Sequence, residues 1–345
     1  MSGRMKQILQ IAATYIGTVV GAGFATGREI VEFFTKYGSA GFAGILISGF
    51  LFIMIGTKLM IIARRINVYS FDEMNRYLFG AAVARVVNLL MLIMLFGVTG
   101  VMLSGTGALF REQLQLPFQA GVFLTVIITY IVMKKGIQGI LWTNSLIVPV
   151  MILFSVILSI SLFHFSAGRH LFFSHDFTAH WRWILSPFAY AAFNLTLAQA
   201  VLVPLSREAK DESVIKWGGF LGGLGLTFIL LNSQYVLYSV PRVLSYEIPI
   251  AEIVGGLGVG VHYIFIFVIF GEIFSTLIGN LFGLAGALQK NVRLSNNVIL
   301  IGLLAGSYLL SQVGYSELLH YLYPLFGTIA LVFLGVVSIK KVQGD

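Results

Sequence analysis

One stretch of the sequence, residues 272–283, carries polar side chains at a spacing that suits the binding of a cation. Glu272, Ser275, Thr276, Gly279, Asn280 and Gly283 are spaced so that all of them fall on one face of a helix. Carboxylate and hydroxyl oxygens are the ligands that hard cations prefer. An acidic side chain such as Glu272 within a hydrophobic segment usually faces a cavity and marks an ion or proton path. The competing interpretation is that Ser275, Thr276 and the glycines only serve close helix packing.

The run GTVVGAGFATG, residues 17–27, places four glycines within the first hydrophobic segment. Two successive GxxxG patterns in it, at residues 17–21 and 23–27, are typical of close helix contact. The alternative is a break in the helix, which a membrane protein tolerates only where protein or a water-filled cavity satisfies the freed backbone groups. The charged run that follows, with Glu29 and Glu32, favours the break, and a helix starting at residues 23–25 would then present N–H groups to an anion. The same charges also fit an interfacial cluster near the outer membrane surface.

The composition predicts an all-α, polytopic membrane protein that forms a single domain over residues 1–345. The chain is 58% hydrophobic and only 10% charged, and its mean hydropathy is +0.92. Apolar segments long enough to cross the hydrocarbon core recur from end to end. We predict ten spans, at residues 8–34, 40–63, 83–110, 117–132, 140–163, 184–205, 214–240, 257–288, 297–310 and 318–337.

The ten spans divide into two halves, residues 7–165 and 184–338, of five spans each. An odd number of spans gives the halves opposite topology, which predicts an inverted repeat. The first span contains the glycine run, and the sixth contains the run SPFAYAAFNLTLAQ with Pro187, Asn194, Thr196 and Gln199. Interruptions at matching positions of two inverted halves point to a transporter binding site. We therefore expect spans one and six to be interrupted.

The basic residues predict the orientation and exclude a nucleic-acid partner. The net charge is +8, but Lys and Arg gather in short clusters between the apolar segments, as in cytoplasmic loops. With the N-terminus inside, only six of the 22 Lys and Arg residues are external, so both termini are predicted to be cytoplasmic. The charged start of the chain is interpreted as retained rather than as a cleaved signal peptide.

Other candidate sites are weaker. The chain has no cysteine and no motif of a known membrane enzyme, so we expect neither an enzyme nor a resident cofactor. Small residues on one face of span three, at positions 97, 100, 104 and 107, favour helix packing. The external His170, His175 and His180 recur every five residues, which does not align them on a helix, and a metal site there is not favoured.

The motif VVGAGFATGREIVEFF in the first span, together with the short chain and its ten spans, resembles the uncharacterised bacterial membrane proteins of the YkvI type. These are distant members of the amino acid–polyamine–organocation superfamily, whose fold is the LeuT type. The resemblance covers nearly the whole chain and is most specific at span one. It implies that spans one and six are broken near the midplane and hold the substrate between them.

The resemblance also implies roles for individual residues. In sodium-coupled members a cation lies between carbonyls of the span-one break and two adjacent hydroxyl residues of span eight. On this chain the carbonyls are those of Gly17 and Val20, and the hydroxyl pair is Ser275 and Thr276. The amides of Gly21, Ala22 and Gly23 would face a carboxylate-bearing substrate, and Tyr190, Phe193 and Asn194 would form the span-six side. Span six lacks the glycines often found at its break, and Glu272 adds a full negative charge.

These observations favour an ion-coupled secondary transporter, using sodium or a proton, for a small amino-acid-like or amine solute. Glu272 would bind a proton, strengthen a sodium site or meet an amine of the substrate. The expected location is the bacterial cytoplasmic membrane, with the lipid bilayer and a small-molecule solute as partners and protein partners unknown. The alternative is a ligand-sensing receptor subunit with the same fold and no transport. A passive channel is less consistent with inverted halves around one central site.

Overall fold

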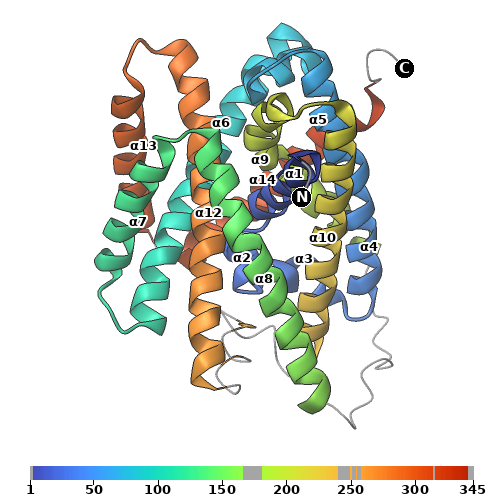
Figure 1. Ribbon diagram of the computed structural model, residues 1–345, viewed down its shortest axis with the longest axis vertical. Coiled ribbons are helices and arrows are strands. Elements are labelled where there is room, and N and C mark those ends of the chain that lie inside the picture. The colour runs from blue at the N-terminus through green and yellow to red at the C-terminus, as the bar shows by residue number, and fades with distance from the viewer. Residues whose placement is uncertain are drawn as a thin grey trace.

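Every regular element of the protein in the described residues is a helix. The computed structural model describes residues 3–165, 181–239, 249–250, 254, 258–313 and 315–340. Figure 1 shows α1 and α9 in the middle of the molecule, between α7 and α13 on one side and α4 and α10 on the other. The elements are α1 (Gly3–Val19), α2 (Ala22–Ala25), α3 (Arg28–Phe33), η1 (Thr35–Tyr37), α4 (Ala40–Leu51), η2 (Phe52–Gly56), α5 (Thr57–Arg65), α6 (Phe71–Gln113), α7 (Phe118–Met133), α8 (Ile137–Phe165), η3 (Trp181–Ile184), α9 (Ser186–Glu208), α10 (Glu212–Tyr238), α12 (Val259–Asn291), α13 (Asn296–Ser311) and α14 (Tyr315–Ile339).

Six helical segments among the described residues are long and apolar enough to cross a membrane. They are Ala40–Arg65, Phe71–Gln113, Ile137–Ser161, Trp183–Glu208, Glu212–Tyr238 and Val259–Lys290. Shorter apolar helices cover Phe118–Met133, Asn296–Ser311 and Ile329–Ile339. Every predicted span after the first therefore falls on a helix, and the second contains a π-helical turn at η2. The prediction of a multi-helical membrane protein is confirmed at this level.

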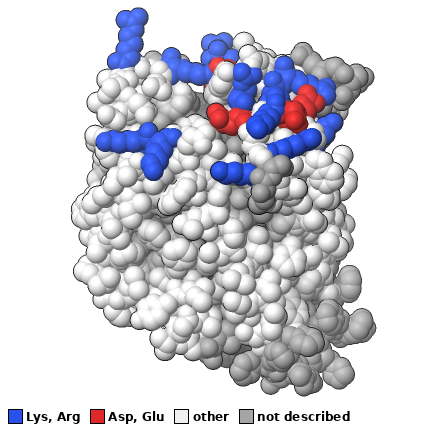
Figure 2. Space-filling model, in the orientation of Figure 1, with Lys and Arg blue, Asp and Glu red and all other residues white. Residues whose placement is uncertain are grey.

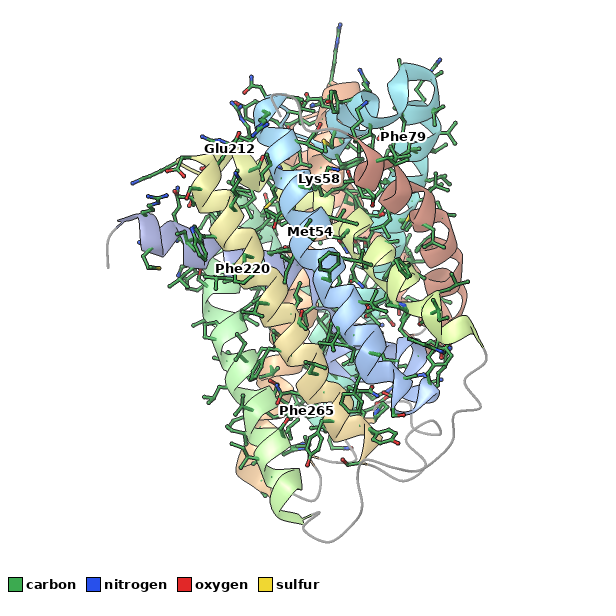
Figure 3. The ribbon with its side chains drawn as sticks, turned by 90° about the vertical axis from the view of Figure 1, so that its right-hand side faces the viewer. Met54, Lys58, Phe79, Glu212, Phe220 and Phe265 are labelled. Atoms are coloured by element: carbon green, nitrogen blue, oxygen red, sulfur yellow. The ribbon has the colours of Figure 1, made fainter. Side chains whose placement is uncertain are left out.

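The surface of the molecule is divided into a charged end and an apolar belt. Lys and Arg gather at one end in Figure 2, while the surface below them carries few charges. Met54 and Phe220 lie in this belt in Figure 3, and their side chains are 56% and 42% exposed, whereas Lys58 and Glu212 lie nearer the charged end. Large exposed apolar side chains over many helices are expected where lipid, not water, is the surrounding solvent.

The first predicted span is interrupted twice. Helix α1 ends at Val19, Val20 and Gly21 are not helical, and the chain resumes as α2 at Ala22. A second bend at Gly27, with φ of 82°, separates α2 from α3. Such a φ value is costly for residues with a side chain, so glycine suits this position. The glycine run thus contains a real break and is not only a packing motif.

The predicted interruption of the sixth span is wrong. Helix α9 continues without a break from Ser186 to Glu208 and includes the whole predicted run. Pro187 lies in the first turn, where a missing N–H costs nothing, because no helical carbonyl precedes it. The amide of Asn194 donates to the carbonyl of Tyr190 one turn earlier and so stays within the helix geometry. Its polar residues therefore project from an intact helix.

Small residues of α10 bring α1 into the centre of the fold. A Cβ atom on Gly218 or Gly222 would lie 2.6 Å from Ile11 Cγ2 or 2.7 Å from Tyr15 Cδ1, respectively. The Tyr15 hydroxyl donates to the carbonyl of Phe52, 2.8 Å away, at the start of the π-helical turn. Small residues at one-turn spacing let two backbones approach closely in a membrane. The position of the break in span one thus depends on α10 and η2.

Polar contacts fix the charged end. The Arg65 guanidinium makes two bonds with the carboxylate of Glu212, at 2.7 Å and 3.0 Å. Arg64 donates to the carbonyls of Ala209 and Lys210 at the end of α9. The residues just before the predicted third span form the first part of α6, and Gly80, with φ of 77°, separates them from the rest of this helix.

The external His170, His175 and His180 fall outside the described residues. Between α10 and α12, the N–H of Ile250 donates to the carbonyl of Thr26 at 3.2 Å. In span three, a Cβ atom on Gly100 would overlap Leu310, and this confirms a packing role.

Replacing Gly222 by alanine tests the α1–α10 contact. The new Cβ atom would overlap the Tyr15 ring, and overpacking of this kind costs about 1–3 kcal/mol. We expect a lower midpoint of thermal unfolding for G222A in detergent. The matched control is G302A on α13, where a Cβ atom meets nothing within 4 Å. Equal midpoints for the two variants would contradict the contact.

Candidate functional site

The hydroxyl pair of α12 meets the carbonyls at the break of span one. Ser275 Oγ donates to the carbonyl of Gly17 at 2.7 Å, and Thr276 Oγ1 donates to the carbonyl of Val20 at 2.8 Å. The last carbonyls of a helix have no partner in the next turn, and the break creates such an end in the middle of the molecule. The structure therefore brings together the four residues that the sequence grouped as a cation site.

A residue of α8, Asn144, completes this cluster. Its Oδ1 atom also accepts a hydrogen bond from Ser275 Oγ, and its Nδ2 atom is buried and has no partner among the described residues. Gly17 makes this approach possible, because a Cβ atom there would overlap the Asn144 amide and lie 3.1 Å from Ser275 Oγ. A hydroxyl has one hydrogen, so Ser275 satisfies only one of its two acceptors at a time. The cluster thus contains five oxygen atoms, from two carbonyls, two hydroxyls and one amide, but only the two hydroxyl hydrogens to link them.

Glu272 lies one turn before the hydroxyl pair and is buried. Its side chain is 3% exposed, and its Oε2 atom has no hydrogen-bond partner in the part of the chain that the structure describes. A buried carboxylate without a partner is costly in its charged form. Glu272 is therefore buried in the interior of the protein, whereas the cavity and the ligand expected for it stay predictions.

The rest of the same face of α12 has a packing role. A Cβ atom on Gly279 would lie 3.1 Å from Val201, and one on Gly283 would overlap Ala200, both on α9. Asn280 is buried, and its Nδ2 atom has no partner among the described residues. The polar face therefore divides into a part that meets the break and a part that packs against α9.

The predicted span-six residues meet the outer part of span one. Asn194 Nδ2 donates to Glu29 Oε1 at 3.2 Å and to the carbonyl of Tyr190 at 3.0 Å. The Tyr190 ring packs against Phe33 and Phe34, with ring centroids 5.3 Å and 4.9 Å away. Phe193, which directly precedes Asn194 in the sequence, is also buried. These contacts join α9 to α3.

Residues 21–23 lead from the break into α2, which begins at Ala22. A Cβ atom on Gly21 would lie 3.0 Å from Thr276 Oγ1, so this glycine allows α12 to approach. Ala22 begins α2, and the carbonyl of Gly23 accepts from Thr26 Oγ1 at 3.2 Å. Binding of a substrate by these amides stays a prediction.

Two buried polar residues were missed or underrated from the sequence. Asn144 is a single amide within the apolar run of span five, and no residue near it in the sequence indicates its partner. Glu29 was grouped with Glu32 as part of an interfacial cluster, but only Glu32 is exposed there, in an ion pair with Lys36. The only available signal was that both lie inside predicted spans, where polar groups are costly.

Comparison with known proteins gives close relatives without an assigned activity. No family model matches the chain. The sequence is 47% identical over 332 residues to the uncharacterised membrane protein YkvI of Bacillus subtilis, covering 96% of this chain and 95% of that protein. It is 27% identical over 331 residues to the uncharacterised protein YyaD of the same organism, covering 96% and 94%.

Solved structures of transporters share the fold. A substrate-bound, outward-open Na⁺-coupled sialic acid symporter matches with a TM-score of 0.67 and 13% identity, over 96% of this chain and 77% of that one. A nucleobase-cation-symport-1 family transporter in a closed conformation matches with a TM-score of 0.61 and 14% identity, with the same coverage. A manganese transporter of Eremococcus coleocola matches with a TM-score of 0.60 and 11% identity, over 97% and 77%.

These structural matches establish the fold, and the sequence match establishes the kinship. The matching structures agree with the LeuT-like fold that the resemblance implied, and the regular elements of the described residues are all helices. Identity of 47% over nearly the full length of both chains is far beyond what a shared fold alone produces. The chain is a multi-pass membrane protein and belongs to the YkvI family.

Proposed function

We propose that the chain is an ion-coupled secondary transporter that moves a small amino-acid-like or amine solute across the bacterial cytoplasmic membrane by alternating access. The observation that carries this proposal is the contact of Ser275 and Thr276 with the freed carbonyls of Gly17 and Val20. Among the proteins of this fold, one is a Na⁺-coupled symporter and another is a manganese transporter. These neighbours favour transport over the sensing alternative.

The chemistry of the cluster suits a hard cation. The carbonyls of Gly17 and Val20, the hydroxyls of Ser275 and Thr276 and the amide oxygen of Asn144 provide five neutral oxygens. Such oxygens replace the hydration shell of a small cation, and the two hydroxyl hydrogens of Ser275 and Thr276 do not satisfy the three acceptors, which are the two carbonyls and the Asn144 amide oxygen. Sodium is the coupling ion that this set of ligands favours. The residues Gly17, Val20, Ser275 and Thr276 would then hold it.

Glu272 supports a proton as the competing coupling ion. It lies one turn from the hydroxyl pair, and its buried carboxylate has an oxygen without a described partner. A carboxylate in this position either strengthens the attraction for sodium or takes up a proton itself. Both roles make Glu272 part of the coupling site.

The proposed topology has ten spans with both termini cytoplasmic. Helices α1–α3 would form span one, and the halves 7–165 and 184–338 would form an inverted repeat, as in the amino acid–polyamine–organocation superfamily. The charged end of the molecule would face the cytoplasm by the positive-inside rule. Spans one, two, six and seven would rock against three, four, eight and nine. Because α9 is continuous, the break in span one is the hinge near the site.

The proposed solute site lies between span one and α9. The amides of Gly21, Ala22 and Gly23 would meet a carboxylate of the solute, and Tyr190, Phe193 and Asn194 would form the opposite side. The buried contacts of Tyr190 and Asn194 with α3 support this arrangement. A change at these contacts would alter how a solute outside the cell reaches this site.

The variant T276V tests the site without knowledge of the solute. Valine keeps the shape and leaves the carbonyl of Val20 without its donor, which costs about 1–3 kcal/mol for a buried group. We expect a lower unfolding midpoint in detergent and no stabilisation by added sodium chloride relative to choline chloride. T125V is the matched control, because the buried Thr125 hydroxyl donates only to Gly121 within its own helix. Equal sodium stabilisation of T276V and the wild type would remove Thr276 from the site.

Transport itself is tested by uptake into proteoliposomes. A panel of radiolabelled amino acids and amines is offered to wild-type protein with and without an inward sodium gradient. We expect accumulation that depends on the gradient and that S275A and T276A abolish, because each variant removes one oxygen ligand. Accumulation that ignores both sodium and proton gradients would overturn ion coupling.

The variant E272Q separates the two coupling ions. Glutamine keeps the shape but removes the charge, so we expect the sodium concentration for half-maximal uptake to rise about tenfold, with the pH dependence unchanged. Proton-driven uptake that ignores sodium and disappears in E272Q would assign the coupling ion as a proton. Unchanged dependence on both ions would remove Glu272 from coupling.

A further inference from the structure

A second buried carboxylate, Glu29, lies on α3 beyond the break in span one. Its side chain is 5% exposed, and its Oε1 atom accepts from Asn194 Nδ2 of α9 at 3.2 Å. Gly27, in the left-handed conformation, turns the chain so that α3 presents this residue to α9. Glu29 is thus held at the junction of two elements that must move relative to other parts of the protein during transport.

Glu29 has no positive partner among the described residues. Its neighbour on the same short helix, Glu32, is exposed and pairs with Lys36, but no Lys or Arg nitrogen of the described chain pairs with Glu29. Asn194 contributes only a neutral amide, and that amide is shared with the carbonyl of Tyr190. A buried carboxylate is stable as an anion only with a cation nearby. The ammonium group of a bound solute would supply such a cation.

Aromatic rings beside Glu29 indicate which cation this is. Asn194 links Glu29 to Tyr190, whose ring centroid lies 5.3 Å from that of Phe33, 4.9 Å from that of Phe34 and 5.9 Å from that of Phe52. Aromatic faces together with a carboxylate are suited to an organic ammonium group. A metal ion would instead require several further oxygen ligands, whereas these four rings carry a single oxygen, the Tyr190 hydroxyl.

We propose that Glu29 binds the ammonium group of the transported solute, with Asn194 as the residue that positions its carboxylate. This inference rests on the proposed transport function and names its substrate class: solutes that carry a primary amine. Glu272 then serves the coupling ion, because it lies on α12 one turn from the hydroxyl pair, whereas Glu29 meets α9. The site discriminates against a solute in which a hydroxyl replaces the ammonium.

The experiment measures thermal stabilisation of the purified full-length protein by matched pairs of compounds. Ethanolamine, alanine and putrescine are each compared with the hydroxyl counterpart, which is ethylene glycol, lactate or butanediol. We expect at least one amine to stabilise the wild type while its counterpart does not. In E29Q the concentration needed for half-maximal stabilisation rises about tenfold or more, because a charge-assisted bond is lost. E29D retains the charge and shows a smaller rise.

The control is E32Q, which removes the exposed carboxylate of the same helix and leaves amine binding unchanged. Stabilisation of E29Q by sodium shows that this variant is folded and that its ion site is intact. If E29Q does not fold, N194A provides the second test, with weaker amine binding as the expected result. Wild-type amine affinity in the tested variant, equal stabilisation by the hydroxyl counterparts, or no stabilisation by any amine would overturn the proposal. The proposed transport function is contradicted by a different result, namely that the wild type shows no gradient-driven uptake in proteoliposomes.

Discussion

The hydrogen bonds between the broken first span and α12 are the contacts on which the rest of the site depends. A break inside a membrane-spanning segment exposes carbonyls that lipid does not satisfy. Ser275 and Thr276 satisfy those of Gly17 and Val20 from a neighbouring helix, and the absence of a side chain at Gly17 lets Asn144 approach as well. The break is therefore stable only while α1 and α12 stay in register. Any movement that separates them must replace these partners, and under the proposed function a bound cation would do this.

The sequence predicted those parts of the fold that depend on local pattern. Apolar runs located the helices, and helical spacing placed Glu272, Ser275 and Thr276 on one face before any partner was known. The prediction for the sixth span was wrong because its polar residues were interpreted as signs of a break. Pro187 is harmless in a first turn, and Asn194 bonds within the helix and with Glu29, so neither interrupts it. Asn144 and the buried state of Glu29 depend on partners more than a hundred residues away, which periodicity does not reveal.

Glycines in this chain act in two physically different ways, which explains why their pattern alone was ambiguous. Gly27 adopts a left-handed conformation and bends the backbone between α2 and α3. Gly17 and Gly222 have ordinary helical conformations, but a side chain on either would collide with a neighbouring element. A GxxxG pattern predicts the second role only. The first span needs both, since it must be bent and must also be approached from three sides.

Charge balance links the coupling ion to the solute. Glu29 and Glu272 place two carboxylates near the break, and neither has a positive partner in the described chain. Under the proposed assignment one coupling cation offsets Glu272, and one ammonium offsets Glu29. Under the same assignment a simple amine leaves the loaded site neutral, whereas an amino acid adds a carboxylate, which the proposed solute site assigns to the backbone amides of residues 21–23. An acid in a low-dielectric interior is unfavourable as an anion without a cation beside it. Each of the two proposed positive ligands would therefore offset the cost of one buried acid, and a solute that carries no positive charge would leave Glu29 unpaired.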